Sequence, residues 1–509
     1  MQIRQTNKGT KSVNYTLPAP IGGLNARDSL DMMQNTDAVV MDNYYPAETK
    51  VVLRKGYSHY VSLNAEIETL AEYKSASQNR LLAFGNKTVF DVSTQAEVKN
   101  FEKNFHSNRW QFAQFKDRLI CVNGIDAPQT YYFNNEEAVF EEASFCGTNL
   151  SAHKLVNIGV SKKRLFFAEK GSLNVWYSEG VGEVQGNLIK FDLSSLVRRG
   201  GTIQAIGCWT QDGGQGIDDL TVFLTSEGEV LVYSGSDPSN ADDWTLKGSY
   251  LISKPLGYRC LLEYQGDLVV LTVDGYLPLS KALPVSQANA SSVSFSDKIR
   301  GLVLDRTKSN ASKAGWQGIL YPSGGYGLFN VPTGGQFEQH IVNLSSGAWC
   351  RFTDILACCW SLYGNRLYFG SKQGVYLFDD GYSDNGTAIK GIVRQAYTDL
   401  GSPFLKKIQL INPRTKASSK YALVIYTEMD FIDEDKDFKA QIGVSGLTKW
   451  GTAPWGSKWA TLRGKIRSQW IANNATGFKA SVVFKTKTKG NLIEWIDTGF
   501  RYETGTGIL

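Results

Sequence analysis

NRLLAFGNKTVFDV, residues 79–92, is the stretch that decides the fold. It contains two short runs, NRLLAFG from Asn79 and KTVFDV from Lys87. Both have period-two alternation and are rich in β-branched or aromatic residues, which predicts a strand for each. Because the second run follows the first almost at once, the pair predicts a β-hairpin.

The first run recurs through the middle of the chain as a turn residue, Arg-Leu or a close variant, and alternating apolar residues. The copies are NRLLAFG (Asn79), DRLICVNG (Asp117), KRLFFAE (Lys163), DLTVFLT (Asp219), DLVVLTV (Asp267), YGLFNV (Tyr326) and NRLYFGS (Asn365). Most copies are followed by a second strand-like run, namely KTVFDV (Lys87), QTYYF (Gln129), GSLNVWY (Gly171), GEVLVY (Gly228), GYLPLS (Gly275) and GVYLFD (Gly374).

The copies start roughly 40 to 60 residues apart, and a four-stranded propeller blade takes about 40–50 residues. An up-and-down sandwich would also have strands and turns, but no hairpin recurring at the length of a blade. The sequence therefore predicts an all-β fold in which residues 60–389 form a β-propeller-like body of six to eight blades.

The other two predicted regions are residues 1–59, an N-terminal arm with a helix–strand segment ahead of the propeller, and residues 390–509. The latter carry 19 Lys and Arg against 10 Asp and Glu, a net charge of +9, and residues 1–389 carry −4. With longer strand-like runs such as YALVIYTEM from Tyr421, they predict an additional basic C-terminal β-domain. The polar start predicts no signal peptide, and the lack of a long apolar run predicts no membrane span.

Motifs for chemistry are scarce, which predicts a protein that is not an enzyme and has no cofactor and no metal. None of the four histidines lies near another His, Cys or carboxylate in a metal-binding motif, and HExxH, CxxC, GxSxG and Walker patterns are absent. Asp433, Asp435 and Asp437 imitate a calcium loop, but Phe438 and Val444 occupy its glycine and glutamate positions. The seven scattered cysteines are expected to be reduced and mostly buried.

The stretch IGGLNARDSLDMMQNTDAVVMDNYYP, residues 21–46, is specific but holds no catalytic residue types. We expect Gly22-Gly23 to allow a tight backbone turn, and Thr36 or Asp37 to cap a short helix over residues 38–41 that Pro46 ends. A strand would then start at VVLRKGY. The structural signature that we single out consists of Gly22, Gly23, Leu24, Asn25, Asp37, Asn43, Pro46, Arg54 and Gly56.

This signature resembles the N-terminus of the tail nozzle or hub proteins (tail tubular protein B-like) of short-tailed bacteriophages. Residues 226–250 and 266–280, and NLSSGAWCRF from Asn343, are similar to stretches of sequence in prophage tail proteins. The resemblance covers most of residues 20–389, is weaker beyond, and supplies no catalytic residue.

The resemblance implies a virion structural protein of the tail, made in the host bacterial cytoplasm. It would form a homo-oligomer, a hexameric ring, joined to a portal or head–tail adaptor protein and in contact with tail fibres or spikes. Phage DNA would pass through the lumen during ejection without sequence-specific binding. A net negative charge over residues 1–389 suits such a conduit, because each Lys–phosphate contact would add affinity for the DNA that has to pass.

Two other functions compete with this one. Propeller enzymes such as sialidases and other glycosidases place carboxylates at the channel mouth, so a glycan-binding or glycan-cleaving receptor-recognition propeller is the alternative. Tryptophans such as Trp450, Trp455, Trp459 and Trp470 could stack on sugars, although such residues more often pack in cores or interfaces. A scaffold propeller of the WD-repeat kind would need a Gly-His and Trp-Asp signature that is missing here.

Overall fold

The computed structural model describes residues 12–212, 217–283, 294–418, 421–433, 441–442 and 465–505. The chain divides into two compact units. The propeller unit consists of His59–Gln339 and Asp354–Phe378, and the sandwich unit of Met1–Ser58, His340–Thr353 and Asp379–Leu509. This division differs from the three consecutive regions expected from the sequence, because residues 1–58 and 379–509 belong to one unit.

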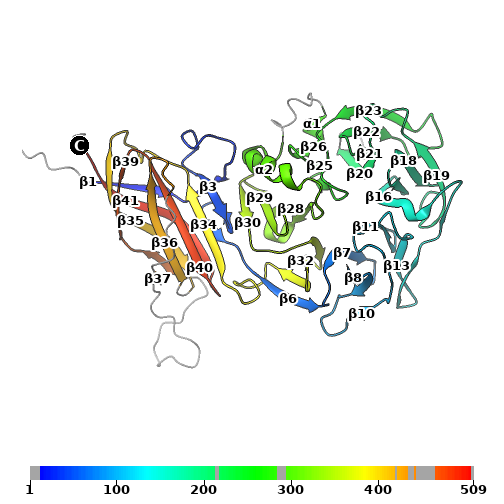
Figure 1. Cartoon of the computed structure of the whole chain (residues 1–509), viewed down its shortest axis with the longest axis horizontal. Helices are drawn as coiled ribbons and strands as arrows, with labels where there is room; N and C mark the ends of the chain where they lie inside the picture. The colour runs from blue at the N-terminus through cyan, green and yellow to red at the C-terminus, as the bar shows by residue number, and fades with distance from the viewer. Residues whose placement is uncertain are drawn as a thin grey trace, which may run out of the picture. The chain divides into compact units, whose positions relative to one another are not determined.

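The propeller unit is a ring of antiparallel sheets, drawn from blue through cyan to yellow-green in Figure 1. Its first three sheets in chain order contain β7 (Ile67–Lys74), β8 (Asn79–Gly85), β9 (Thr88–Asp91) and β10 (Lys99–Asn100); β11 (Gln111–Phe115), β12 (Arg118–Val122), β13 (Gln129–Asn134) and β14 (Glu137–Glu142); and β15 (Phe145–Cys146), β16 (Leu155–Ser161), β17 (Arg164–Glu169), β18 (Asn174–Ser178) and β19 (Gly186–Asp192).

The remaining strands complete the ring. They are β20 (Ile203–Asp212), β21 (Ile217–Thr225), β22 (Glu229–Ser234) and β23 (Thr245–Leu251); β24 (Leu261–Tyr264), β25 (Asp267–Thr272) and β26 (Gly275–Pro278); β27 (Gln317–Tyr321), β28 (Tyr326–Pro332) and β29 (Phe337–Asn343); and β31 (Cys359–Tyr363), β32 (Arg366–Ser371) and β33 (Gly374–Phe378) with β6 (Tyr57–Ser62). Six of these groups of strands are separate sheets. The strands β27–β29 form a further group, which follows the sheet of β24–β26 and precedes that of β31–β33 along the chain.

The expected propeller of six to eight blades is confirmed in the described residues. The innermost strands contact one another in a closed circle, in the order β7, β11, β16, β20, β24, β27, β31 and back to β7. Each copy of the repeated run lies on the second strand of its sheet, and each following run lies on the third. The ring closes because β6, from the start of the unit, pairs with β33 at its end.

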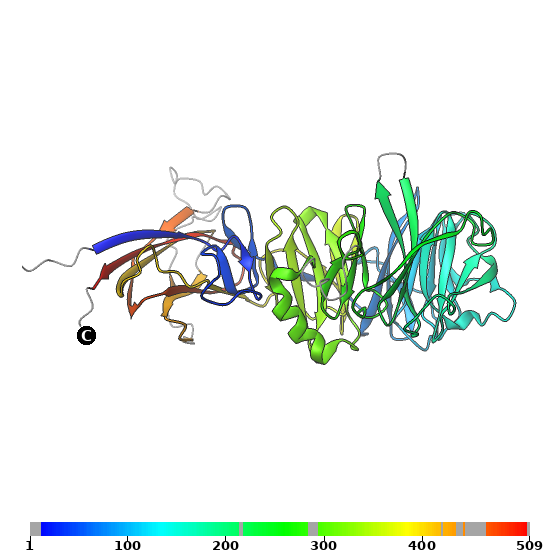
Figure 2. The same ribbon diagram turned by 90° about the horizontal axis from the view of Figure 1, so that it is seen from above.

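Short helices are few in the described part of this unit. They are η1 (Ala152–Lys154), α1 (Leu279–Ala282), η3 (Asp297–Ile299), α2 (Arg300–Asn310) and η4 (Pro322–Gly324). Figure 2 shows α2 lying along the propeller strands, where it contacts β26 and β28. No helix among the described residues is long and apolar enough to span a membrane.

The core of the propeller unit lies between adjacent sheets, because the strands carry apolar residues on both faces. NRLLAFG, for example, buries Leu81, Leu82, Ala83 and Phe84. Leu81 and Ala83 pack in the cluster shared with β31–β33, whereas Leu82 and Phe84 pack in the cluster shared with β11–β14. A strand buried on both faces binds its sheet to both neighbours in the ring.

The sandwich unit has two sheets, which include the additional C-terminal β-structure expected from the sequence. One contains β38 (Lys465–Ser468), β35 (Lys406–Ala417), β41 (Ile493–Thr504), β5 (Val51–Leu53) and β4 (Tyr44–Pro46), with β1 (Ser12–Pro18) on β41 and β39 (Ile471–Gly477) on β35. The other contains β30 (Trp349–Phe352), β2 (Gly23–Leu24), β3 (Asp37–Asp42), β34 (Ile389–Gln395), β40 (Ala480–Thr488), β36 (Tyr421–Met429) and β37 (Gln441–Ile442).

Aromatic side chains join the two sheets of the sandwich unit. Phe484 of β40 stacks on Trp495 of β41, with ring centroids 4.5 Å apart, and contacts Tyr44 of β4 edge-on at 5.9 Å. The Tyr44 hydroxyl lies 2.7 Å from the Thr486 hydroxyl on β40. The sheets therefore pack face to face around a core to which the N-terminal and C-terminal segments both contribute.

Candidate functional site

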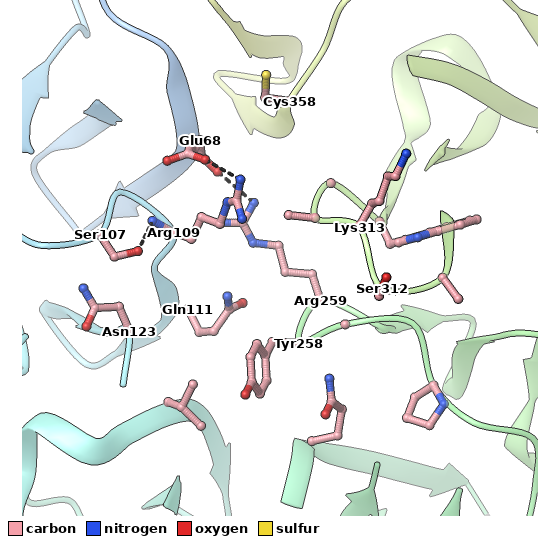
Figure 3. A pocket seen from close by; sticks show the side chains of 18 of the residues that line it. Glu68, Ser107, Arg109, Gln111, Asn123, Tyr258, Arg259, Ser312, Lys313 and Cys358 are labelled. Carbon is pink, nitrogen blue, oxygen red and sulfur yellow. Dashed lines mark hydrogen bonds and ion pairs between the residues drawn. The ribbon is translucent and has the colours of Figure 1, made fainter. Parts of the chain in front are cut away.

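A cavity in the propeller unit lies where the innermost strands begin and has a volume of about 570 Å³ (Figure 3). Each set of strands contributes a residue at or just before the start of its first strand. These residues are Glu68, Gln111, Val156, Gln204, Arg259, Trp316 and Cys358. Because all innermost strands run in the same direction around the channel, their first residues converge at one end of it.

Arg109, Arg259 and Glu68 form the charged centre of the cavity, and the two arginine side chains converge on Glu68 (Figure 3). The Arg109 Nη2 lies 2.7 Å from the Glu68 Oε1. The Arg259 guanidinium donates to three neutral acceptors instead: the Glu68 carbonyl at 3.3 Å, the Thr69 Oγ1 at 2.6 Å and the Trp110 carbonyl at 2.9 Å. Arg259 therefore links the sheet of β24 to those of β7 and β11.

The electrostatics of this centre favour an anion. Burial lowers the pKa of Arg259, and the nearby Arg109 guanidinium lowers it further, although Arg259 stays protonated near neutral pH. Four cationic side chains line the cavity (Arg109, Lys170, Arg259 and Lys313), against two carboxylates, Glu66 and Glu68. The propeller unit as a whole has more acidic than basic residues, so the net charge of the cavity lining is opposite in sign to that of the unit.

The cysteine thiols at the cavity are poor nucleophiles. The Cys358 thiol lies 3.6 Å from the Glu66 Oε1 and donates to it, and burial raises the Cys358 pKa far above its usual value. Burial also raises the pKa of the adjacent Cys359 to about 12. A thiol of raised pKa is a poor nucleophile at neutral pH because little thiolate is present.

Metal ligation and cysteine pairing are also absent from the described residues. No group of three or more His, Cys, Asp and Glu side chains there could hold a metal ion. All seven cysteines are free and four are buried, which agrees with the expected reduced and mostly buried thiols. One histidine does meet a carboxylate, since the exposed His106 Nδ1 lies 2.7 Å from Asp126 Oδ1, a contact that sequence spacing did not indicate.

The residues of the predicted signature lie in the sandwich unit rather than around this cavity. The Arg54 side chain is 1% exposed and forms a bidentate pair with Asp384, with both contacts at 2.7 Å. Its Nε donates to Asn43 Oδ1 at 2.8 Å, and Asn43 in turn donates to Thr353 and to the Lys390 carbonyl. Asn43 also has a positive φ of 60°, which asparagine tolerates better than most residues.

The glycine end of the signature is closely packed. A Cβ on Gly22 would lie 2.4 Å from Asp37 Oδ1, and one on Gly23, whose φ is +81°, would lie 2.4 Å from the Trp349 carbonyl. Gly56 is tighter still, because a Cβ there would lie 1.9 Å from the Ser383 carbonyl. These positions exclude any side chain, which extends the expected role of Gly22-Gly23 from a turn to a close approach between strands.

Three further signature residues complete the arrangement. Asn25 donates to Asp37 at 2.8 Å, and both side chains are buried. Leu24 is buried on β2, where it pairs with Ala38. The carbonyl of Pro46 accepts a hydrogen bond from Asn343 Nδ2 at 2.9 Å. The signature residues thus contact several segments of the sandwich unit.

The predicted helix over residues 38–41 is wrong. DAVVMD forms β3, which lies inside a sheet between β2 and β34. Its two valines favour a strand, and its neighbour β34 is supplied from some 350 residues along the chain, so local capping signals did not decide the structure. Pro46 accordingly ends β4 rather than a helix.

Other sequence candidates lie partly outside the described residues. This applies to Asp435 and Asp437 of the calcium-like turn, and to Trp450, Trp455 and Trp459. Trp470 is described and is 46% exposed in the sandwich unit.

No protein-family model matches the chain, and no curated protein matches it by sequence. Among solved structures, it is similar to the extracellular domain of a hybrid two-component system from B. thetaiotaomicron, with 11% identity and a TM-score of 0.41 over 65% of this chain. The chain spans 40% of the length of that one. It is also similar to BBS1N, crystallised in complex with ARL6DN, with 14% identity and a TM-score of 0.28 over 45% of this chain and 73% of the other. Likenesses at these scores carry no argument about function.

Proposed function

We propose that this chain is a structural protein of the tail of a short-tailed bacteriophage, a nozzle or hub that assembles with copies of itself and with a portal or head–tail adaptor protein. In this role the chain binds neighbouring proteins and surrounds the passing DNA, and it carries out no reaction. The observation that carries the proposal is the structural use of the signature on which the resemblance rests.

Eight of the nine signature residues are buried, and Gly22 is partly buried. Arg54, Asn43 and Asp37 have their polar groups paired inside the sandwich unit. Residues placed in this way serve architecture rather than catalysis, because none presents a reactive group to solvent. A motif of this kind is expected in a protein whose task is assembly.

A second support is an exposed apolar cluster at one end of the sandwich unit, formed by Phe404, Phe431, Ile432 and Phe478. Phe404 and Phe478 are 63% and 53% exposed. The four come from neighbouring segments of the unit, because Lys406 pairs with Gly477 and the Phe478 amide donates to Asp430. Exposed apolar side chains grouped in this way mark protein–protein contacts.

The ion pairs beside this cluster suit a docking surface. Arg394 pairs with Asp433, and Lys479 pairs with Asp31. A polar rim around an apolar centre is the usual anatomy of a protein interface. We assign this cluster to contacts between neighbouring copies of the chain.

Negative-stain microscopy and analytical ultracentrifugation of the full chain, alone and mixed with the head–tail adaptor protein of the same phage, test the proposal. The expected result is a ring or a co-complex. A Phe404→Ser, Phe478→Ser double variant should reduce assembly, whereas Val181→Ser, at an equally exposed apolar residue of the propeller unit, should not.

The proposal fails if neither a ring nor a co-complex forms with correctly folded protein. It also fails if the isolated chain degrades bacterial surface polysaccharide, because this result would favour the glycan-cleaving alternative.

A further inference from the structure

The propeller cavity has hydrogen-bonding groups that no neighbour uses. A guanidinium has five N–H donors, and Arg259 places three of them on Glu68, Thr69 and Trp110. Its Nε–H and one Nη1–H therefore lack a partner among the described residues. Arg109 contributes a second guanidinium whose one partner among those residues is Glu68. Of the two, only Arg109 pairs with the Glu68 carboxylate, and Arg259 lies close enough to feel the charges of both groups.

This arrangement disfavours the empty cavity. Two cations that face one carboxylate repel each other, and the Arg109 guanidinium is one cause of the lowered pKa of Arg259. A ligand carboxylate between the two guanidinium groups would balance their charges and accept the unused N–H groups. Arginine is well suited to this because its planar fork matches the geometry of a carboxylate.

Neutral polar groups and an aromatic ring line the same cavity. The carboxamides of Gln111 and Gln204 line the cavity and have no hydrogen-bond partner among the described side chains and backbone groups. Each offers both donors and an acceptor, which is what a ring of hydroxyl groups requires. Tyr258, below Arg259 in Figure 3, is 36% exposed and offers an apolar face.

We propose that the propeller cavity binds an acidic sugar residue of the uronic acid class. Arg109 and Arg259 hold the carboxylate, Gln111 and Gln204 bind ring hydroxyls, and Tyr258 packs against the C–H face of the ring. The cavity volume of about 570 Å³ lies within the range of roughly 300–1,000 Å³ that is typical of small-ligand sites. This site lies wholly within the propeller unit and does not depend on the proposed tail function.

Isothermal titration calorimetry of the full chain with D-galacturonate tests this site, with D-galactose, acetate and inorganic phosphate as matched ligands. Galacturonate should bind saturably and at least about tenfold more tightly than galactose, since one charge-assisted contact is worth that much. Acetate and phosphate should bind more weakly than galacturonate, because they lack the hydroxyl groups and the ring. The affinity for galacturonate should fall as salt is raised.

Variants separate the roles of the residues. Arg109→Gln, at a side chain that is 59% exposed, should weaken galacturonate binding about tenfold or more without unfolding the chain. Gln111→Ala should weaken galacturonate and leave the weak binding of acetate unchanged. Lys308→Gln removes one positive charge from α2, outside the cavity lining, and should bind like the parent.

Arg259→Gln is informative only with a thermal unfolding curve, because Arg259 also links neighbouring sheets. The inference is overturned if galactose, acetate or phosphate binds as tightly as galacturonate. It is equally overturned if galacturonate does not bind, or if Arg109→Gln and Gln111→Ala bind it like the parent. Ring formation is measured separately, so failure of this site leaves the proposed assembly role untouched.

Discussion

Replacing Arg54 with methionine should destabilise the sandwich unit far more than the loss of an ordinary surface charge. Arg54 uses all five of its N–H donors: one on Asn43, two on Asp384, and one each on the carbonyls of Lys55 and Thr353. Asp384 is nearly as buried as Arg54, with a side chain 7% exposed. Methionine fills much of the volume but leaves that carboxylate buried without its cation.

The expected cost is about 3–5 kcal/mol, the range for removal of one partner from a buried ion pair. The matched control is Lys55→Met at the next residue. Lys55 pairs with Asp379 at 3.1 Å, but its side chain is 46% exposed. An exposed pair contributes about 0–1 kcal/mol, because water screens it.

Hydrogen exchange followed by mass spectrometry is a suitable assay because it reports each unit separately in a chain that need not unfold in one step. Peptides from β3 and β34 should lose about a hundredfold or more of their protection in Arg54→Met. Peptides from β17 and β22 of the propeller unit should keep theirs.

A double variant, Arg54→Met with Asp384→Leu, should recover part of the loss, since an apolar pair can replace a buried ion pair. The reasoning is refuted if Arg54→Met costs no more than Lys55→Met, or if the double variant is less stable than the single one.

Three further predictions follow from particular contacts. Gly23→Ala should destabilise the sandwich unit more than Gly347→Ala in urea unfolding. Both glycines have a positive φ, which alone costs about 1–2 kcal/mol in an alanine variant, but a Cβ at Gly23 would meet a carbonyl at 2.4 Å, whereas one at Gly347 would meet nothing within 4 Å. Equal losses of stability in the two variants would contradict the contact argument. Among the cysteines, Cys146 is exposed, whereas burial raises the pKa of Cys260 to about 12. Iodoacetamide should therefore label Cys146 first, and Cys146→Ser should remove the fast phase of labelling. Rapid labelling of Cys260 in folded protein would count against this prediction. Burial disfavours ionisation of Glu494, but hydrogen bonds from Lys50 and Lys416 outweigh the effect of burial and lower the pKa of Glu494 below the usual 4.5 or so. Because the pKa is lower in the folded state, the stabilisation is present above about pH 4.5 and is lost as the pH falls through the folded pKa. In urea unfolding between about pH 3 and 6, Glu494→Gln should therefore reduce the loss of stability at acid pH.

The propeller could be predicted from the sequence because its information is local. In NRLLAFGNKTVFDV both strands of a hairpin lie within one short stretch, and β8 and β9 pair through Gly85 and Thr88. The repeat then predicts a range of six to eight blades, because each copy marks one second strand. The first strands carry no such shared pattern, so the repeat does not point to the cavity that they line.

The sandwich unit and the cavity depend on distant residues. DAVVMD pairs with β34, and the Arg54 carboxylate partner is Asp384, so neither neighbour can be read from the local sequence. In the cavity, Glu68, Arg109 and Arg259 come from three sheets and meet through ring closure. The one shared signal is position: the cavity residues lie at or just before the start of the first strand of each blade, but they differ in residue type.

The nested order of the two units has a consequence for synthesis on the ribosome. β1 pairs with β41, and β3 pairs with β34, so the N-terminal strands of the sandwich unit have to wait until the propeller unit has been translated. The propeller unit, closed by β6 and β33, can complete its ring earlier. During this interval β1 and β3 emerge without β41 and β34, and their open edges are exposed to wrong pairing and aggregation. Expression yield should therefore depend on chaperones that bind the first 60 or so residues of the nascent chain, more than on those that act later.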